Sequence, residues 1–148
     1  MATDADQGGE APCWAHLVDD LDPPASAPPI RSSNTILYCD AWLDVVAFYR
    51  DRLGLRTTME RDWFVEFELH PGARVSVADA SRATVAAGTG QGVTLSVGVD
   101  DIAAARAWLH STGIDVPAPT MRWGAHQFFI HDPAGNRIEF WSPLPDPS

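Results

Sequence analysis

Hydrophobic and polar positions follow the same order twice along this chain. The first half predicts a strand, a helix and three further strands, at residues 34–39, 42–53, 55–60, 62–69 and 74–78. The second half repeats this order at residues 93–99, 102–109, 116–120, 127–130 and 138–141. A βαβββ module has a sheet that is bare on one face, so it needs a neighbour to cover or extend it. We therefore expect an α+β fold in which two tandem modules form a curved, mixed sheet around a cavity.

The two modules cover about residues 33–80 and 93–142 of a single domain, predicted over residues 31–145. Residues 1–30 are acidic and proline-rich and contain no Lys or Arg, which is typical of a flexible leader. Residues 80–92 are rich in Ala, Gly, Ser and Thr, and we expect them to link the modules.

A β-hairpin near the C-terminus carries the most distinctive local signal. Pro133 presets its own φ, Gly135 permits a positive φ, and Asp132 and Asn136 can bond their own backbone. These turn formers separate two apolar runs. The second run contains a single acid, Glu139, which is the first candidate for a functional residue.

Charge and composition exclude several classes of function. The formal net charge is −10 and every cation is an arginine. An acidic chain without clustered cations is not expected to bind nucleic acid, and the absence of lysine excludes Schiff-base chemistry and the P-loop. No apolar run is long enough to span a membrane and no signal peptide is visible, so we expect a soluble cytoplasmic protein in which Cys13 and Cys39 are reduced thiols.

Three segments together resemble the vicinal oxygen chelate superfamily. They are Ala47-Phe48-Tyr49-Arg50-Asp51-Arg52-Leu53-Gly54-Leu55, Val99-Asp100-Asp101 and Asp132-Pro133-Ala134-Gly135-Asn136-Arg137-Ile138-Glu139. That superfamily includes glyoxalase I, extradiol dioxygenases, methylmalonyl-CoA epimerase, fosfomycin-resistance enzymes and bleomycin-binding proteins. The resemblance covers roughly residues 33–142 and is specific for fold, but the fold hosts both binding and several chemistries. It also implies a homodimer.

The resemblance implies a place for a divalent metal, because metal-dependent relatives take His, Glu or Gln from the first and last strands of each module. The corresponding positions here are Asn34, a residue near Ser76, Thr94 and Glu139. Only Glu139 matches such a ligand, and a catalytic site usually needs about three protein ligands. We therefore predict no cofactor and no metal ligands, with a divalent metal as the alternative.

His126 is the second catalytic candidate beside Glu139. If the hairpin pairs Phe128 with Glu139, then His126 and Glu139 share a face of the sheet. A register shifted by one residue places Gln127 on that face instead. Glu139 also has a purely structural interpretation, as the partner of Arg137 or another arginine.

The predicted ligand-binding residues are small or polar side chains on the open face of the sheet, together with aromatic residues on or beside the strands. They are Asn34, Tyr38, Trp63, Ser76, Thr94, Ser96, Trp123, Phe128 and Trp141. Any one of the aromatic residues could simply fill the core, whereas several lining one pocket would stack on a planar ligand or hold a cation.

These observations predict a metal-independent protein that binds a planar or cationic small molecule, for example an antibiotic that it sequesters. The main alternative is a lyase, isomerase or dioxygenase that uses Glu139, either with His126 and a divalent metal or as a metal-free base that moves a proton. A non-catalytic partner subunit is a third interpretation.

Overall fold

The computed structural model describes residue 28 and residues 30–144. Most of the predicted leader, with Cys13, therefore lies outside the described residues. Within them, no helix is long and apolar enough to cross a membrane.

Each half of the chain forms one βαβββ module, as the sequence predicts. The first module consists of β1 (Ser33–Cys39), α2 (Trp42–Ala47), the π-helical turn η2 (Phe48–Arg52), β2 (Arg56–Arg61), β3 (Phe64–His70) and β4 (Ala73–Asp79). A short 3-10 turn, η3 (Ala80–Arg82), begins the linker. The second module consists of β5 (Thr94–Gly98), α3 (Ile102–Ser111), β6 (Thr120–Arg122), β7 (Ala125–His131) and β8 (Arg137–Pro143).

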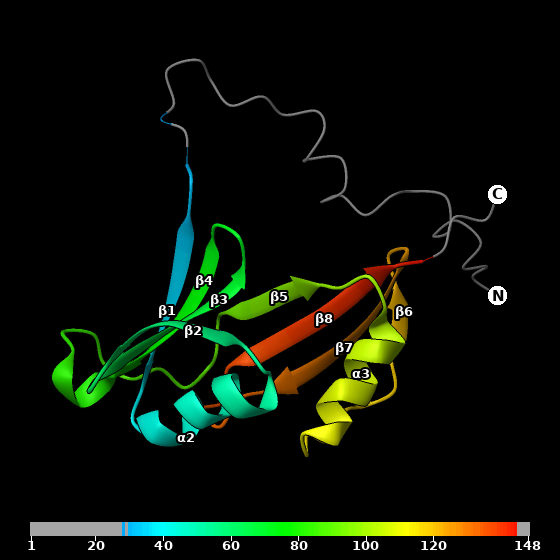
Figure 1. The fold of residues 1–148 in the computed structure, drawn as a ribbon. Coiled ribbons are helices and arrows are strands. Elements are labelled where there is room, and N and C mark those ends of the chain that lie inside the picture. The colour runs from blue at the N-terminus through cyan, green and yellow to red at the C-terminus, as the bar shows by residue number, and fades with distance from the viewer. Residues whose placement is uncertain (1–27, 29, 145–148) are drawn as a thin grey trace.

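The strands form two four-stranded mixed sheets rather than one continuous sheet. Sheet A has the order β1-β4-β3-β2 and sheet B has the order β5-β8-β7-β6. In each sheet the first strand runs parallel to the last strand of its module, and the other pairs are antiparallel. Helices α2 and α3 lie on the same side of the molecule, which leaves the opposite face of each sheet open (Figure 1).

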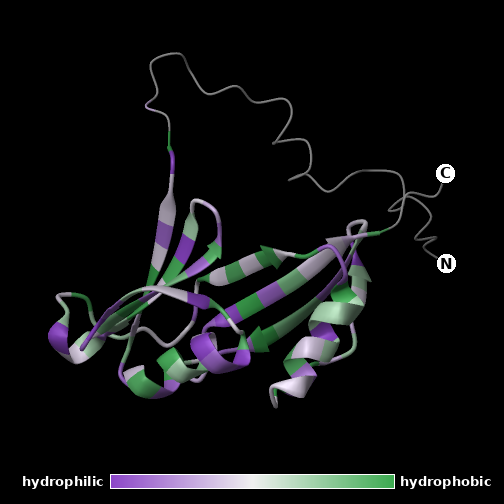
Figure 2. Cartoon of the chain, viewed as in Figure 1, coloured by the Kyte–Doolittle hydropathy of each residue, from purple (hydrophilic) through white to green (hydrophobic). Residues whose placement is uncertain are grey.

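The core lies between the sheets and the helices and joins the two modules. Its fully buried side chains come from both halves of the chain and include Tyr49, Phe67, Leu109 and Ile138. Strands with one core face alternate apolar and polar residues, which Figure 2 shows as alternating bands along β5. The open faces are thereby left for polar and functional side chains.

Asp101 caps the start of α3. The Asp101 side chain accepts a hydrogen bond from the backbone N–H of Ala104 at 3.0 Å, which satisfies a donor of the first turn. Gly54 and Gly113 follow the two helical segments with φ values of +70° and +94°. These left-handed positions explain why glycine ends both helical segments.

Most strands begin or end within one or two residues of the predicted limits, and two of the differences affect the placement of a named side chain. Trp63 lies in the turn between β2 and β3, because Arg61 pairs with Phe64 and leaves a two-residue connection. Within the segment 116–120, only Thr120 belongs to a strand. Val116 is buried with 2% of its surface exposed, so its side chain packs into the core without joining a sheet.

Candidate functional site

The turn between β7 and β8 sets the position of Glu139. Asp132 is buried and accepts hydrogen bonds from the backbone N–H groups of Ala134 and Asn136 at 3.0 and 2.8 Å, and from Asn136 Nδ2 at 2.8 Å. The Asp132 N–H donates to the Asn136 carbonyl at 3.0 Å. These bonds close the turn so that His131 pairs with Arg137, and every pair further along the hairpin follows from that register.

This register pairs Phe129, not Phe128, with Glu139. Of the two registers that the sequence left open, the structure has the one that places Gln127 on the same face as Glu139. The parallel neighbour β5 pairs Ser96 with Glu139. The open face of sheet B therefore presents a carboxylate, a hydroxyl and an amide side by side.

A cavity of about 400 Å³ opens on this face. Its lining combines apolar and polar side chains from all four strands of sheet B and from the β6–β7 turn: Ser96, Gly98, Arg122, Trp123, Ala125, Gln127, Glu139 and Trp141. The size lies within the range of small-molecule sites. Four of the predicted site residues, Ser96, Trp123, Glu139 and Trp141, come together here.

The carboxylate of Glu139 is oriented by one short hydrogen bond. Ser96 Oγ donates to Glu139 Oε1 at 2.6 Å. Arg137 does not pair with Glu139, because its Nε donates to Thr94 Oγ1 at 2.8 Å and its guanidinium lies 4.4 Å from the centre of the Phe129 ring. Glu139 therefore keeps acceptor capacity toward the cavity, which a cation or a hydrogen-bond donor could use.

Trp141 forms a flat part of the cavity lining because Gly98 lies beneath it. A Cβ atom at Gly98 would lie 2.8 Å from Trp141 Cζ2, which is closer than real carbon contacts allow. Glycine thus lets the indole approach the backbone of β5. In the sequence, Gly98 is only a small residue near the end of the predicted strand 93–99.

The β6–β7 turn brings two further side chains to the cavity. Arg122 pairs with Ala125, so Trp123 and Gly124 alone form the turn, with φ values of +49° and +74°. The Arg122 guanidinium lies 5.5 Å from the centre of the Trp123 ring. The sequence reasoning missed Arg122, although a residue followed by glycine between two strand patterns was a usable hairpin signal.

His126 and Phe128 lie on the opposite face of sheet B from Glu139. His126 pairs with Met121 and Ser142, and Phe128 pairs with Phe140. Phe128 is buried, and its ring stacks on Phe140 with centroids 5.3 Å apart. The register therefore contradicts the expectation that His126 and Glu139 share a face of the sheet, and neither His126 nor Phe128 lines the cavity.

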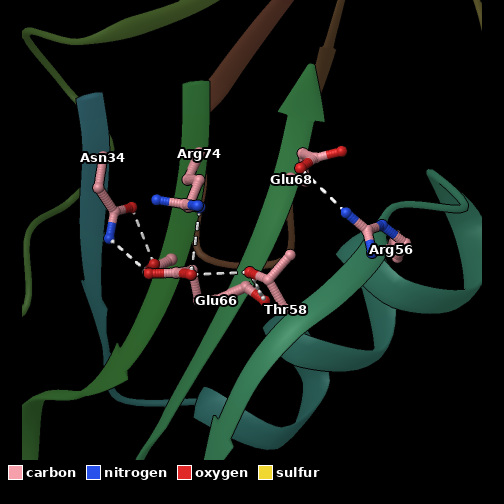
Figure 3. A network of polar contacts seen from close by, with 7 residues as sticks. Asn34, Arg56, Thr58, Glu66, Glu68 and Arg74 are labelled. Carbon is pink, nitrogen blue, oxygen red and sulfur yellow. Dashed lines mark hydrogen bonds and ion pairs between the residues drawn. The ribbon is translucent and has the colours of Figure 1, made fainter. Parts of the chain in front are cut away.

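The open face of sheet A holds a separate polar network, shown in Figure 3. Ser76 Oγ donates to Asn34 Oδ1 at 2.8 Å, and Asn34 Nδ2 donates to Glu66 Oε2 at 3.4 Å. Glu66 also accepts from Thr58 Oγ1 at 2.7 Å and lies 3.3 Å from Arg74 Nε. The predicted ligand residues Asn34 and Ser76 thus bind each other and their neighbours in the sheet.

The remaining predicted ligand residues also lie away from the cavity lining. Tyr38 is half-buried on β1, on the same open face of sheet A as Asn34. Trp63 packs on Phe64 with ring centroids 5.4 Å apart. Thr94 is the acceptor for Arg137. The structure thus divides the predicted set between two sheets.

The positions that the family resemblance assigned to a metal do not form a metal site here. Asn34 and Ser76 lie on sheet A, whereas Thr94 and Glu139 lie on sheet B. Among residue 28 and residues 30–144, no three His, Cys, Asp or Glu side chains gather where they could hold an ion. These four positions supply one carboxylate, two hydroxyls and an amide, and all of these groups already bond to other residues. They do not fit a divalent ion, because such an ion needs about three protein ligands.

Comparison with known proteins identifies the family of this fold. The model of the Glyoxalase/Bleomycin resistance protein/Dioxygenase superfamily matches residues 35–140. Among curated protein sequences, none matches the chain.

Solved structures with a similar fold include proteins of different function. A glyoxalase/bleomycin resistance protein/dioxygenase from Nocardioides is 24% identical, with a TM-score of 0.67 over 84% of this chain and 91% of that one. A lactoylglutathione lyase from Agrobacterium tumefaciens is 27% identical, with a TM-score of 0.62 over 78% and 95%. TnmS3, an antibiotic binding protein from Streptomyces sp. CB03234, is 18% identical, with a TM-score of 0.64 over 81% and 99%.

Proposed function

Since the chain belongs to the Glyoxalase/Bleomycin resistance protein/Dioxygenase superfamily, we propose that it binds a planar small molecule in the sheet B cavity without a metal ion. The observation that carries this proposal is the cavity itself, where two indoles and one carboxylate meet in about 400 Å³. Such a combination of flat apolar surface and few polar groups is typical of ligand sites. The antibiotic-binding neighbour TnmS3 supports an antibiotic as the guest.

Each cavity residue has a defined part in this proposal. Trp141 offers a flat surface on which an aromatic ring can stack. Glu139, held by Ser96, accepts a hydrogen bond from the guest or attracts a cationic group. Gln127, with 8% of its surface exposed, lies beside Trp141 and supplies an amide.

Calorimetric titration of EDTA-treated protein with a panel of planar antibiotics tests the proposal. We expect at least one compound to bind, to be recovered unchanged, and to bind about tenfold more weakly to Trp141→Ala. Trp108→Ala is a matched control, because Trp108 is an exposed indole on α3 that does not line the cavity. A panel without any binder, or equal losses in both variants, would contradict the proposal.

The enzyme alternative uses Glu139 alone. Its carboxylate lies in the cavity, where it could remove a proton from a bound guest, whereas His126 lies on the other face of the sheet. The lactoylglutathione lyase neighbour favours this class. Chemical change of a panel compound that stops in Glu139→Gln would establish it, and metal analysis of the purified protein would show whether an ion takes part.

We further propose that two copies associate in the cytoplasm. The open face of sheet A leaves the apolar side chains of Ile36 and Met59 each 38% exposed, and a second copy could cover them. Light scattering at micromolar concentration should give twice the chain mass of 16.1 kDa. A mass of one chain would rule out this association.

A further inference from the structure

We infer that the guest is bipolar: a planar ring system with a hydrogen-bond donor at one end, held by Glu139, and an anionic group at the other end, held by Arg122. This inference rests on the proposed function and specifies its ligand class. It goes beyond a merely planar or cationic guest, because it assigns an acid to the guest.

The register of sheet B places the two charged residues at opposite ends of the cavity. Arg122 pairs with Ala125 at the β6–β7 turn, whereas Glu139 pairs with Phe129, four residues further along β7. Residues on one face of a strand are spaced by about 6.6 Å, so these two rows are roughly 13 Å apart at the backbone. The long Arg122 side chain can shorten that span from the turn end.

The residues that lie between Arg122 and Glu139 are suited to contact an aromatic ring of the guest rather than a charged group. They are Gln127, Trp141 and Gly98, paired across three strands. Gly98 keeps the Trp141 indole close to the backbone, and Gln127 is nearly buried. A two-ring aromatic guest over Trp141 would therefore direct its substituents toward Arg122 and Glu139.

Among the described side chains, none neutralises the charge of Arg122 or Glu139. Within the described residues, Arg122 and Glu139 belong to no ion pair, although four other arginines do. The guanidinium of Arg122 lies over Trp123, and Glu139 accepts from the neutral Ser96 hydroxyl. A guest with an anion at one end and a donor at the other would complement both charges.

The turn that carries Arg122 also shows a mark of a functional position. Trp123 has a φ of +49°, a conformation that bulky residues rarely adopt and that Asn or Gly adopts easily. Strain of this kind persists where the surroundings enforce it, often at ligand sites. Here it holds an indole, 64% exposed, beside the guanidinium at the edge of the cavity.

Three naphthalene probes test the inference by calorimetry at pH 7 and low ionic strength. The probe 6-amino-2-naphthoate has both groups, 2-naphthoate has only the acid, and 2-naphthylamine has only the donor. We expect 6-amino-2-naphthoate to bind most tightly. Arg122→Gln should weaken both acids about threefold to tenfold and leave 2-naphthylamine unchanged, since an exposed ion pair contributes modestly. Glu139→Gln should weaken the two amines and leave 2-naphthoate unchanged or tighter.

Three controls separate the effect of the Arg122 charge from a general disturbance of the cavity. Arg122→Lys should retain most of the affinity for both acids, because it restores the charge. Arg61→Gln removes an exposed arginine that does not line the cavity, and it should leave all three affinities unchanged. Added salt should weaken the two acids in the wild type and should have little effect in Arg122→Gln.

Several outcomes would overturn the inference. Equal weakening of all three probes by Arg122→Gln would show that the residue shapes the cavity without binding an acid. Wild-type protein that binds a panel antibiotic but none of the three probes would also refute the bipolar class while leaving the proposed function intact. Failure of the whole antibiotic panel would instead remove the proposed function.

Discussion

Trp123 occupies a backbone conformation that suits a smaller residue. Its φ of +49° at the first position of a two-residue turn costs an L-residue about 1–2 kcal/mol, and Asn is favoured there. We predict that Trp123→Asn raises the melting temperature by about 2–5 °C and weakens 2-naphthoate binding about threefold to tenfold.

Opposite effects on stability and binding would distinguish a ligand-binding indole from a structural one. Trp123→Phe serves as the control, because it keeps both the ring and the strained turn, so we expect little change in either quantity. Thermal unfolding and calorimetric titration of the same samples provide the measurement. A lower melting temperature in Trp123→Asn would mean that the indole stabilises the fold instead.

Gly98 is predicted to act through Trp141. In Gly98→Ala, the new Cβ would lie 2.8 Å from Trp141 Cζ2, so the indole must tilt away from β5 and narrow the cavity. We expect 2-naphthoate to bind about fivefold to tenfold more weakly, while the free energy of unfolding changes by less than about 1 kcal/mol. Calorimetry measures the affinity, and unfolding followed by near-ultraviolet circular dichroism of the tryptophans measures the free energy of unfolding.

Gly88→Ala is the matched control for this substitution. Its added Cβ would have its nearest neighbour at 3.9 Å, in ordinary contact distance, and its φ is not positive. Affinity in Gly88→Ala should equal that of the wild type. If Gly98→Ala binds the probe as well as Gly88→Ala does, the flat position of Trp141 is not needed for binding.

At the level of elements, the β7–β8 hairpin depends on one buried carboxylate. Asp132 is 4% exposed and accepts from two backbone N–H groups, from Asn136 Nδ2 and from the Tyr49 hydroxyl. Asp132→Ala leaves buried donors without acceptors, so we predict a loss of about 3 kcal/mol in the free energy of unfolding. Urea denaturation measures it. Asp115→Ala, at an exposed site, should change the free energy of unfolding by less than about 0.5 kcal/mol. Equal losses in Asp132→Ala and Asp115→Ala would contradict the prediction.

The sequence predicted which elements form, because their signals are local. Alternation marks β5, Asp101 caps α3, and the turn formers after His131 mark the hairpin. It could not fix the hairpin register. Phe128 and Phe129 are both apolar, so either register places an aromatic ring toward the core, and the observed register accompanies a turn closed by the bonds of Asp132.

The cavity was only partly predictable for the same reason. Glu139, Ser96 and Trp141 follow from strand alternation once β8 is recognised, and they line the cavity. Asn34 and Ser76 were also predicted on an open face, but a hydrogen bond between neighbouring strands of sheet A joins them to each other. How the two modules pack against each other depends on contacts between segments that are distant in the sequence. No local sequence pattern encodes those contacts.

On the scale of the whole molecule, the two modules are joined by a buried polar contact inside the shared core. The Tyr49 hydroxyl donates to Asp132 Oδ2 at 2.9 Å, which links η2 of the first module to the hairpin of the second. Burial, followed by the nearby charges of Asp132 and Asp40, raises the pKa of the Cys39 thiol to about 12. Burial and Asp132 likewise raise the pKa of Tyr49 far above its ordinary value.

These raised pKa values predict a loss of stability at alkaline pH. Above about pH 9 the unfolded chain releases the Cys39 proton, whereas the folded chain keeps it until about pH 12. Unfolding therefore becomes easier across this window, by about 1.4 kcal/mol per pH unit for this group alone, and Tyr49 adds to the loss above pH 10. The chain has no lysine and its arginines stay charged, so few other groups titrate there. Urea unfolding midpoints measured from pH 7 to 11 should fall only above pH 9, and they should fall less steeply in Cys39→Ala. A midpoint that is constant to pH 11 would show that the fold holds neither the Cys39 proton nor the Tyr49 proton.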